Sequence, residues 1–133
     1  MAIIQNNSLL PISSPVFPPK LTVLGSLVNG YDINDLIREK YPEMTGLLTD
    51  LTKCEARWRH DGLWGDNYNS YGVFQFQEDT FYSYCSSGWD WQDMEDQLDC
   101  SVIMIKLGLG PKTVGWYNCY KIMDLCEYDP YCN

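Results

Sequence analysis

The stretch Cys54–Phe76, CEARWRHDGLWGDNYNSYGVFQF, decides the fold because its pattern changes twice along its length. It begins at the end of an apolar helical pattern in which Leu47, Leu51 and Cys54 recur at spacings of three and four. It continues through residues typical of turns and ends in a short apolar segment. Glu55 lies on or beside the apolar stripe of the helix, four residues after Leu51. A carboxylate on a face that ought to be buried requires an explanation.

Helical patterns lie on both sides of this stretch. Apolar periodicity, an N-cap at Asp32 and a helix end at Gly108 and Gly110 predict helices over 33–41, 43–58, 78–85, 90–107 and 111–123. Residues 59–70 predict turns, and residues 71–77 predict a short strand or extended segment. We therefore expect a mainly α domain over residues 31–133, stabilised by disulfides, with a small β-hairpin region after the second helix.

The beginning of the chain differs in composition from the rest. Residues 1–30 carry four of the seven prolines and several Ser and Asn residues, which predicts an irregular arm or linker and a candidate joint to a protein partner. The first 20 residues have no basic segment before an apolar run, so we expect no signal peptide there.

Composition limits the classes of partner. A length of 133 residues indicates one domain, and 45% apolar residues are enough for a core. The formal net charge of −9 argues against binding nucleic acid or an anionic membrane surface, but it leaves a neutral polymer such as a glycan open. No apolar run is long enough to span a membrane.

The six cysteines predict disulfides and an oxidising compartment. Many pairings are open, and the set we favour is Cys126 with Cys132 across a short loop, Cys85 with Cys100 across a turn, and Cys54 with Cys119. The expected location is secreted, periplasmic, the cell envelope or a phage virion. Since there is no CxxC pair and only one histidine, we expect no metal site and no cofactor.

Burial against a tryptophan would give Glu55 a chemical role. Desolvation disfavours the charged carboxylate and raises its pKa, so that the group keeps a proton to donate to a leaving oxygen. Neighbouring aromatic rings and the amides of the Asn-rich turn suit sugars, since rings stack on apolar sugar faces and amides bind hydroxyls.

Plainer interpretations stand beside this one. Glu55 could pair with Arg38, Arg57 or Arg59, or be solvated. His60 is expected to be a surface turn residue, and the five tryptophans to be mostly core. Asp66 could serve only as a turn former, and Gln75 only as a polar strand residue.

The order of these motifs resembles a known superfamily. Glu55 followed by GLWGDNYNSYGVFQF resembles the lysozyme-like superfamily, in particular goose-type lysozymes and the catalytic domain of soluble lytic transglycosylases. Gly72-Val73-Phe74-Gln75 stands where that family has Gly-Leu-Met-Gln, and Ala56 stands where it has Ser. WYNCY at 116–120 is similar to the Ala-Tyr-Asn-Ala-Gly element. The resemblance covers about residues 43–122.

The resemblance implies a lysozyme-like fold for residues 31–133 and an enzyme that acts on peptidoglycan glycan strands. Glu55 would be the general acid that cuts the β-1,4 bond between N-acetylmuramic acid and N-acetylglucosamine. Gln75 and Tyr117 would be cleft residues near that bond, with Asn118 in support. Trp64 and Tyr71 are further candidates for contact with the glycan.

A second carboxylate separates two chemistries. An inverting muramidase needs a base about 6.5–9.5 Å from the acid, with water between them. A lytic transglycosylase needs none, because the acid takes back a proton from the 6-hydroxyl of the sugar and an anhydro ring forms. Asp66 matches one base position of the goose-type enzymes, whereas the other is occupied by Gln77. The sequence leaves both chemistries open.

Two other kinds of protein fit the same pattern. The first is a non-catalytic glycan-binding module on the same fold, suggested by Ala56 and Gln77. The second is a structural or assembly module of a phage particle or envelope machine, joined to other chains through the arm at residues 1–30.

Overall fold

The computed structural model describes residues 32–132, so the predicted arm lies outside the described residues. This part is mainly helical with one small antiparallel sheet, as predicted. The α-helices are α1 (Ile33–Lys40), α2 (Thr45–Ala56), α3 (Glu78–Tyr84), α4 (Met94–Lys106) and α5 (Val114–Ile122). The strands are β2 (Trp64–Gly65), β3 (Ser70–Tyr71) and β4 (Phe76–Gln77), and the 3-10 helices are η2 (Pro42–Met44), η3 (Gly110–Lys112) and η4 (Leu125–Glu127).

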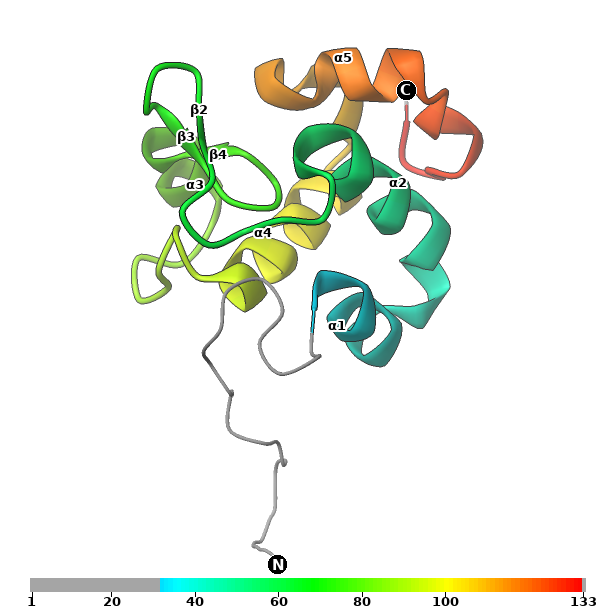
Figure 1. Cartoon of the computed structure of the whole chain (residues 1–133). Coiled ribbons are helices and arrows are strands. Elements are labelled where there is room, and N and C mark those ends of the chain that lie inside the picture. The colour runs from blue at the N-terminus through cyan, green and yellow to red at the C-terminus, as the bar shows by residue number, and fades with distance from the viewer. Residues whose placement is uncertain (1–31, 133) are drawn as a thin grey trace, which may run out of the picture. The chain divides into compact units, whose positions relative to one another are not determined.

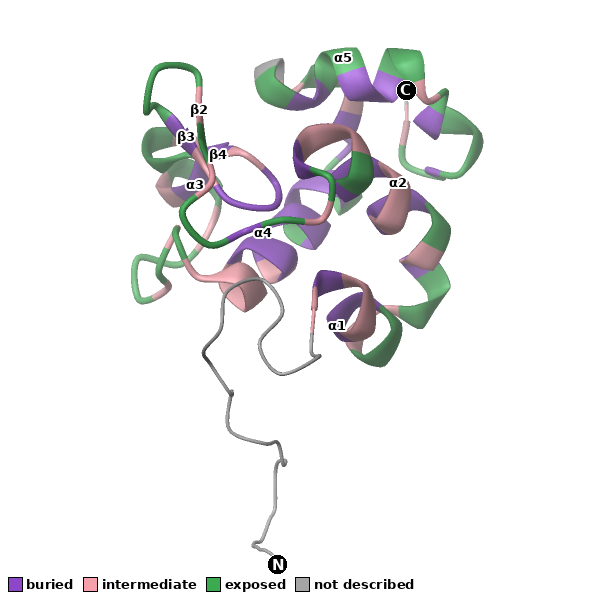
Figure 2. Cartoon of the chain, viewed as in Figure 1, coloured by how far each residue is buried: buried purple, intermediate pink, exposed green. Residues whose placement is uncertain are grey.

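Helix α4 runs through the middle of the domain and contacts both α1 and α3 (Figure 1). The apolar residues that recur along this helix face the core, since Leu98, Val102 and Ile105 are buried and Met94 is half-buried. Much of its surface is purple in Figure 2, which marks it as the centre of the core. The three strands and α3 lie on one side of α4, and α1 and α2 lie on the other (Figure 1).

Helix α2 is shorter than predicted, because η2 precedes it and because Arg57 and Trp58 take left-handed conformations at its end. Two successive residues with positive φ reverse the chain. Trp58 therefore leaves the helical stripe and donates its ring N–H to the carbonyl of Thr49 at 3.0 Å. Glu55 is the penultimate residue of α2, at the point where the chain turns towards the sheet.

The prediction of one strand over residues 71–77 is wrong, because a turn interrupts it. Tyr71 pairs with Trp64 on one side and with Phe76 on the other, so three two-residue strands form a meander. Between β3 and β4, Gly72 and Gln75 have φ values of 83° and 51°. Val73 and Phe74 are fully buried in this turn rather than in a strand.

Two buried side chains bind the backbone of that turn. His60 Nδ1 accepts from the N–H of Val73 at 2.9 Å, and its Nε2 donates to the carbonyl of Gln92 at 2.7 Å. The side chain of Gln97 accepts from the N–H of Phe74 and donates to the carbonyls of Tyr71 and Trp91. A Cβ at residue 72 would collide with the His60 ring, so this position needs glycine.

The expectation that His60 is a surface residue is therefore wrong, since it is 2% exposed. Burial lowers the pKa of its imidazole, which keeps the ring neutral so that one nitrogen accepts and the other donates. Of the five tryptophans, Trp116 is a core residue, whereas Trp64 is 39% exposed. Trp116 donates its ring N–H to the carbonyl of Phe74, which joins α5 to the same turn.

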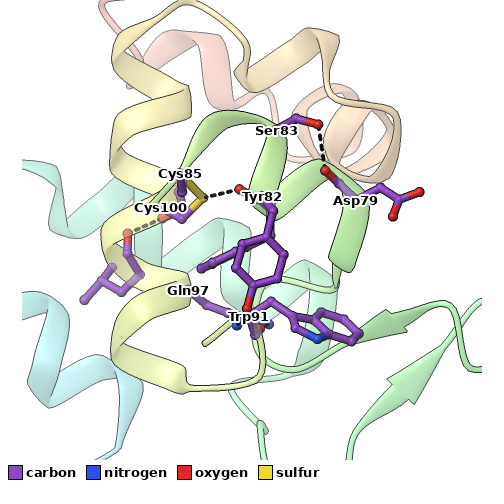
Figure 3. Close-up of a disulfide and its surroundings, with 10 residues drawn as sticks. Asp79, Tyr82, Ser83, Cys85, Trp91, Gln97 and Cys100 are labelled. Atoms are coloured by element: carbon purple, nitrogen blue, oxygen red, sulfur yellow. Dashed lines mark hydrogen bonds between the residues drawn. A yellow bond between two sulfur atoms is a disulfide. The ribbon is translucent and has the colours of Figure 1, made fainter. Parts of the chain in front are cut away.

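The three disulfides pair the cysteines as predicted: Cys54 with Cys119, Cys85 with Cys100, and Cys126 with Cys132. The first joins the end of α2 to α5. The second joins the end of α3 to α4 and closes the loop that contains Trp91 (Figure 3). The third lies in the C-terminal tail, which is also held by a hydrogen bond from Tyr120 to the buried Asp129.

Replacing Gln97 by alanine tests the role of the buried amide. Gln97→Ala leaves one N–H and two carbonyls unpaired in the core, so we expect a loss of about 2–4 kcal/mol in the free energy of unfolding, measured by urea denaturation. The control is Gln92→Ala, which removes an exposed amide side chain and should cost less than about 0.5 kcal/mol. Equal stability of the two variants would contradict this account.

Candidate functional site

Glu55 combines burial with an unsatisfied polar atom. Its Oε2 is buried and makes no hydrogen bond to any described residue. The expected alternative of an ion pair is wrong for Arg38, which bonds to Asp35 at 2.6 Å, and within residues 32–132 Glu55 has no ion pair with Arg57 or Arg59. A native structure rarely leaves a buried oxygen unpaired, so this oxygen requires an explanation, as do the buried oxygens of Asn34 and Thr49, which also lack a partner within the described residues.

The surroundings of Glu55 favour its protonated form. Desolvation is the main cause and the negative charge of Asp66 is the second, and together they raise the pKa of the Glu55 carboxyl to about 8. Near neutral pH the group therefore keeps its proton. A protonated carboxylic acid that is not engaged by the protein can act as a proton donor.

Asp66 lies in the loop between β2 and β3, close enough to Glu55 for its charge to act on that carboxyl. It is exposed, takes a left-handed conformation with φ 51°, and accepts a hydrogen bond from the Ser70 hydroxyl at 2.7 Å. Ser70 is 1% exposed and belongs to β3. The sequence predicted Asp66 but not Ser70, whose side chain orients it.

Gln75 lies across the hairpin region with its side chain fixed. Its Nε2 donates to the carbonyls of Gly72 at 2.9 Å and Leu63 at 3.3 Å. Its Oε1 fills the space that a Cβ at Gly65 would occupy, so a side chain at residue 65 would displace the Gln75 amide. Gln75 is therefore more than a polar strand residue: its amide braces β2 and the turn before β4.

A surface pocket of about 320 Å³ begins at Gln75 and extends between α3 and the start of α5. Its lining includes hydroxyl, amide and aromatic side chains, among them Ser70, Gln77, Thr80, Tyr84, Thr113 and Trp116. Such a mixture suits a polyhydroxylated ligand. Glu55 is not part of this lining.

Trp64 and Tyr71 form the centre of an aromatic cluster on the sheet. Their ring centroids lie 4.8 Å apart, and both rings lie 6.0 Å from Trp91. The Tyr71 hydroxyl accepts from the N–H of Gly62 at 2.8 Å, which fixes the ring. Tyr68 approaches Trp64 at 5.9 Å. Trp91 and Tyr68 were not among the predicted site residues: Trp91 lies outside the quoted family motifs, and Tyr68 lies within the quoted stretch but was not singled out.

Tyr117 and Asn118 lie on the exposed side of α5, away from the buried Trp116 and Cys119. No hydrogen bond within the described residues joins either side chain to Glu55. The link between α5 and the acid is covalent instead, because Cys119 is bonded to Cys54, the residue before Glu55. Glu55, Asp66 and Gln75 are thus the predicted site residues with a geometric basis.

The raised pKa of Glu55 predicts a pH-dependent stability. The folded chain binds this proton up to about pH 8 and the unfolded chain releases it near pH 4.5, so the stabilisation is complete below pH 4.5 and is lost as the pH rises through 8. We expect a loss on the order of 3–5 kcal/mol between pH 5 and pH 9, relative to Glu55→Gln, which cannot ionise. Urea unfolding of both proteins at each pH measures this difference. Parallel pH profiles would contradict it.

Comparison with protein-family models, with curated proteins and with solved structures found no match. Within the described residues, no helix is long and apolar enough to cross a membrane. Nor does that part of the chain bring three or more His, Cys, Asp or Glu side chains into an arrangement that could hold a metal ion. The function is therefore argued from the geometry around Glu55 and from the resemblance of the sequence motifs.

Proposed function

We propose that the protein is a peptidoglycan-cleaving glycosidase with Glu55 as its general acid. The observation that carries the proposal is the buried, unpartnered Oε2 of a carboxyl group whose pKa is raised to about 8. Supporting it are the order of the motifs from Glu55 to Gln75 and the Tyr117-Asn118 pair, which resemble goose-type lysozymes and lytic transglycosylases.

In the first step, Glu55 donates its proton to the oxygen of the glycosidic bond as that bond breaks. The positive charge that develops on the sugar ring is favoured by the carboxylate left behind and by Asp66, whose charge acts on the same place. The Ser70 hydroxyl holds the Asp66 carboxylate in one orientation throughout. Because Glu55 is poorly solvated, its proton is not lost to water before the bond breaks.

The second step separates the two chemistries. In the hydrolytic route, Asp66 orients a water molecule and accepts a proton from it. The oxygen of that water attacks the anomeric carbon. In the transglycosylase route, the Glu55 carboxylate removes the proton from the 6-hydroxyl of N-acetylmuramic acid, and that oxygen closes an anhydro ring. The exposed position of Asp66 is compatible with the first route, and the exposed Gln77 supplies no further base.

The glycan strand is expected to lie along the pocket that begins at Gln75, whose lining shares Gln77 with the pocket that includes Trp64. Hydroxyl and amide groups in that pocket can bind sugar hydroxyls and N-acetyl groups, and Trp116 and Tyr84 offer apolar surface. Tyr117 and Asn118 are exposed on α5, directly before Cys119, whose disulfide leads to Cys54 beside the acid.

A non-catalytic glycan-binding module is the second candidate. It is favoured by Ala56, which is 4% exposed and apolar at a position where the related families have a hydroxyl. Such a module would bind glycan through the pocket and the aromatic cluster but would not cleave it.

Clearing of purified cell walls tests the proposal. Wild-type protein should reduce wall turbidity, and Glu55→Gln, which preserves the shape of the side chain but has no acidic proton, should reduce the rate by at least about 100-fold. The wild-type rate should also fall above about pH 8, as Glu55 loses its proton. Equal clearing by both proteins would end the assignment, and wall binding without clearing by the wild type would select the non-catalytic module.

The reaction products separate hydrolysis from transglycosylation. If Asp66 orients water, Asp66→Asn should lower the rate at least about tenfold, and the products should carry reducing ends. If the 6-hydroxyl attacks, mass spectrometry should find anhydro ends, and Asp66→Asn should keep most of the activity. The matched control is Asp61→Asn, which changes an exposed carboxylate in the preceding turn and should keep the wild-type rate.

A further inference from the structure

We propose that a second pocket, next to β2, binds the side-chain amine of the diamino acid in the stem peptide of peptidoglycan. The inference rests on the proposed function, because it takes its ligand from the same polymer. The pocket has a volume of about 380 Å³, within the range of small-ligand sites. We call it the amine pocket, and its lining consists of Trp64, Tyr68, Asn69, Gln77, Glu78, Asp79 and Trp91.

Three aromatic side chains from separate segments meet at this pocket. Trp64 belongs to β2, Tyr68 to the loop after it, and Trp91 to the loop before α4. The ring of Trp64 lies 5.9 Å from that of Tyr68 and 6.0 Å from that of Trp91, at tilted or edge-on angles. Aromatic faces that surround a hollow attract cations, and tryptophan does so most strongly.

Two carboxylates complete the preference for a cation. Glu78 and Asp79 are exposed in the first turn of α3, and within residues 32–132 neither forms an ion pair. Acids in a first helical turn ordinarily serve only to favour the helix end. Here they also line a pocket with aromatic walls, and the formal net charge of the chain is −9, so a positively charged group is favoured and an anion is repelled.

The loop that supplies Tyr68 is held in an unfavourable backbone conformation. Asp66, Asn67 and Tyr68 all have positive φ, at 51°, 57° and 70°. For a bulky residue such as tyrosine this region is uncommon and costs free energy. The Tyr68 side chain is 77% exposed, so core burial does not explain the conformation. The strained loop places an aromatic ring at the edge of the amine pocket.

The opposite wall of the pocket is rigid. Gln97 donates to the carbonyl of Trp91, and the N–H of Trp91 donates to the Tyr82 hydroxyl. Figure 3 shows the Trp91 ring and the Asp79 carboxylate on the side of α3 away from the Cys85–Cys100 disulfide. A fixed wall lowers the entropic cost of binding a flexible ligand.

The position of the pocket fits a peptide attached to the glycan. Trp64 is two residues before Asp66, whose charge acts on Glu55, and Gln77 lines both the amine pocket and the pocket that begins at Gln75. A stem peptide branches from N-acetylmuramic acid, the sugar at the bond to be cut. Its diamino acid ends in a primary amine on an alkyl chain, which can lie against the rings while the ammonium group meets the two carboxylates.

The test uses a soluble disaccharide-tripeptide that ends in L-lysine, titrated into the Glu55→Gln protein so that no cleavage occurs. The same muropeptide with its ε-amine acetylated is the paired probe, and tryptophan fluorescence or calorimetry measures the Kd. We expect acetylation to weaken binding about tenfold, since it removes the charge. Adding Glu78→Gln and Asp79→Asn should weaken binding of the free-amine probe to the same extent and leave the acetylated probe unchanged.

The control adds Glu43→Gln and Glu127→Gln, which change the net charge equally at exposed carboxylates outside the pocket lining and should leave both Kd values unchanged. Tyr68→Gly should weaken binding of the amine and raise the urea midpoint, because it removes both the ring and the strain. Equal affinity for the two probes would overturn the proposal. So would a weakening of free-amine binding in the Glu43→Gln, Glu127→Gln control as large as that in the Glu78→Gln, Asp79→Asn variant. Wall clearing by the wild type without amine discrimination would overturn the amine pocket alone, whereas discrimination without clearing would support it and overturn cleavage.

Discussion

The turn over residues 72–75 depends on hydrogen bonds from two buried side chains, and the candidate site is built around that turn. His60 and Gln97 satisfy backbone groups that the short strands leave unpaired, and Trp116 does the same from α5. Three parts of the chain that are far apart in sequence therefore converge on Val73 and Phe74. A buried polar group without a partner is costly, so this turn has one stable arrangement, and Gln75 and the sheet take their positions from it.

Within residues 32–132 three buried side-chain oxygens have no partner, on Asn34, Thr49 and Glu55, and Glu55 is the carboxyl group among them. The core pairs its buried histidine, glutamine and Asp129, yet leaves one carboxyl oxygen at the end of α2 without a partner. The unpaired carboxyl oxygen lowers the free energy of unfolding. The three disulfides and the packing around α4 offset that loss. Strain in the loop at residues 66–68 lies next to the same place. Proteins that carry out chemistry concentrate such unfavourable features at one site.

The sequence predicted helix positions to within a few residues, because apolar periodicity is a local signal. It also predicted Cys126–Cys132 and Cys85–Cys100, which are 6 and 15 residues apart, and Cys54–Cys119, 65 residues apart, was the pair that remained. It failed at Trp58, where two consecutive non-glycine residues have positive φ, and in the segment after Tyr71, where Gly72 and Gln75 do, because positive φ at a non-glycine residue has no reliable sequence signature. It also placed His60 on the surface, since its neighbours are turn residues, whereas its partners Val73 and Gln92 come from distant parts of the chain. Glu55 was singled out by its place on the apolar stripe of a helix, and the motif resemblance suggested the roles of Glu55 and Asp66. Ser70, Tyr68 and Trp91 required the three-dimensional contacts.

The disulfide between Cys54 and Cys119 makes the connection between α2 and α5 depend on the redox state of the surroundings. It is the covalent tie between α2 and α5, and it is attached to the residue before the acid. Under reducing conditions this tie would be absent, and the packing of α2 against α5 would have to hold the end of α2 in place by itself. The position of the Glu55 side chain is thus coupled to the redox state of the protein's surroundings, through the residue beside it in the chain.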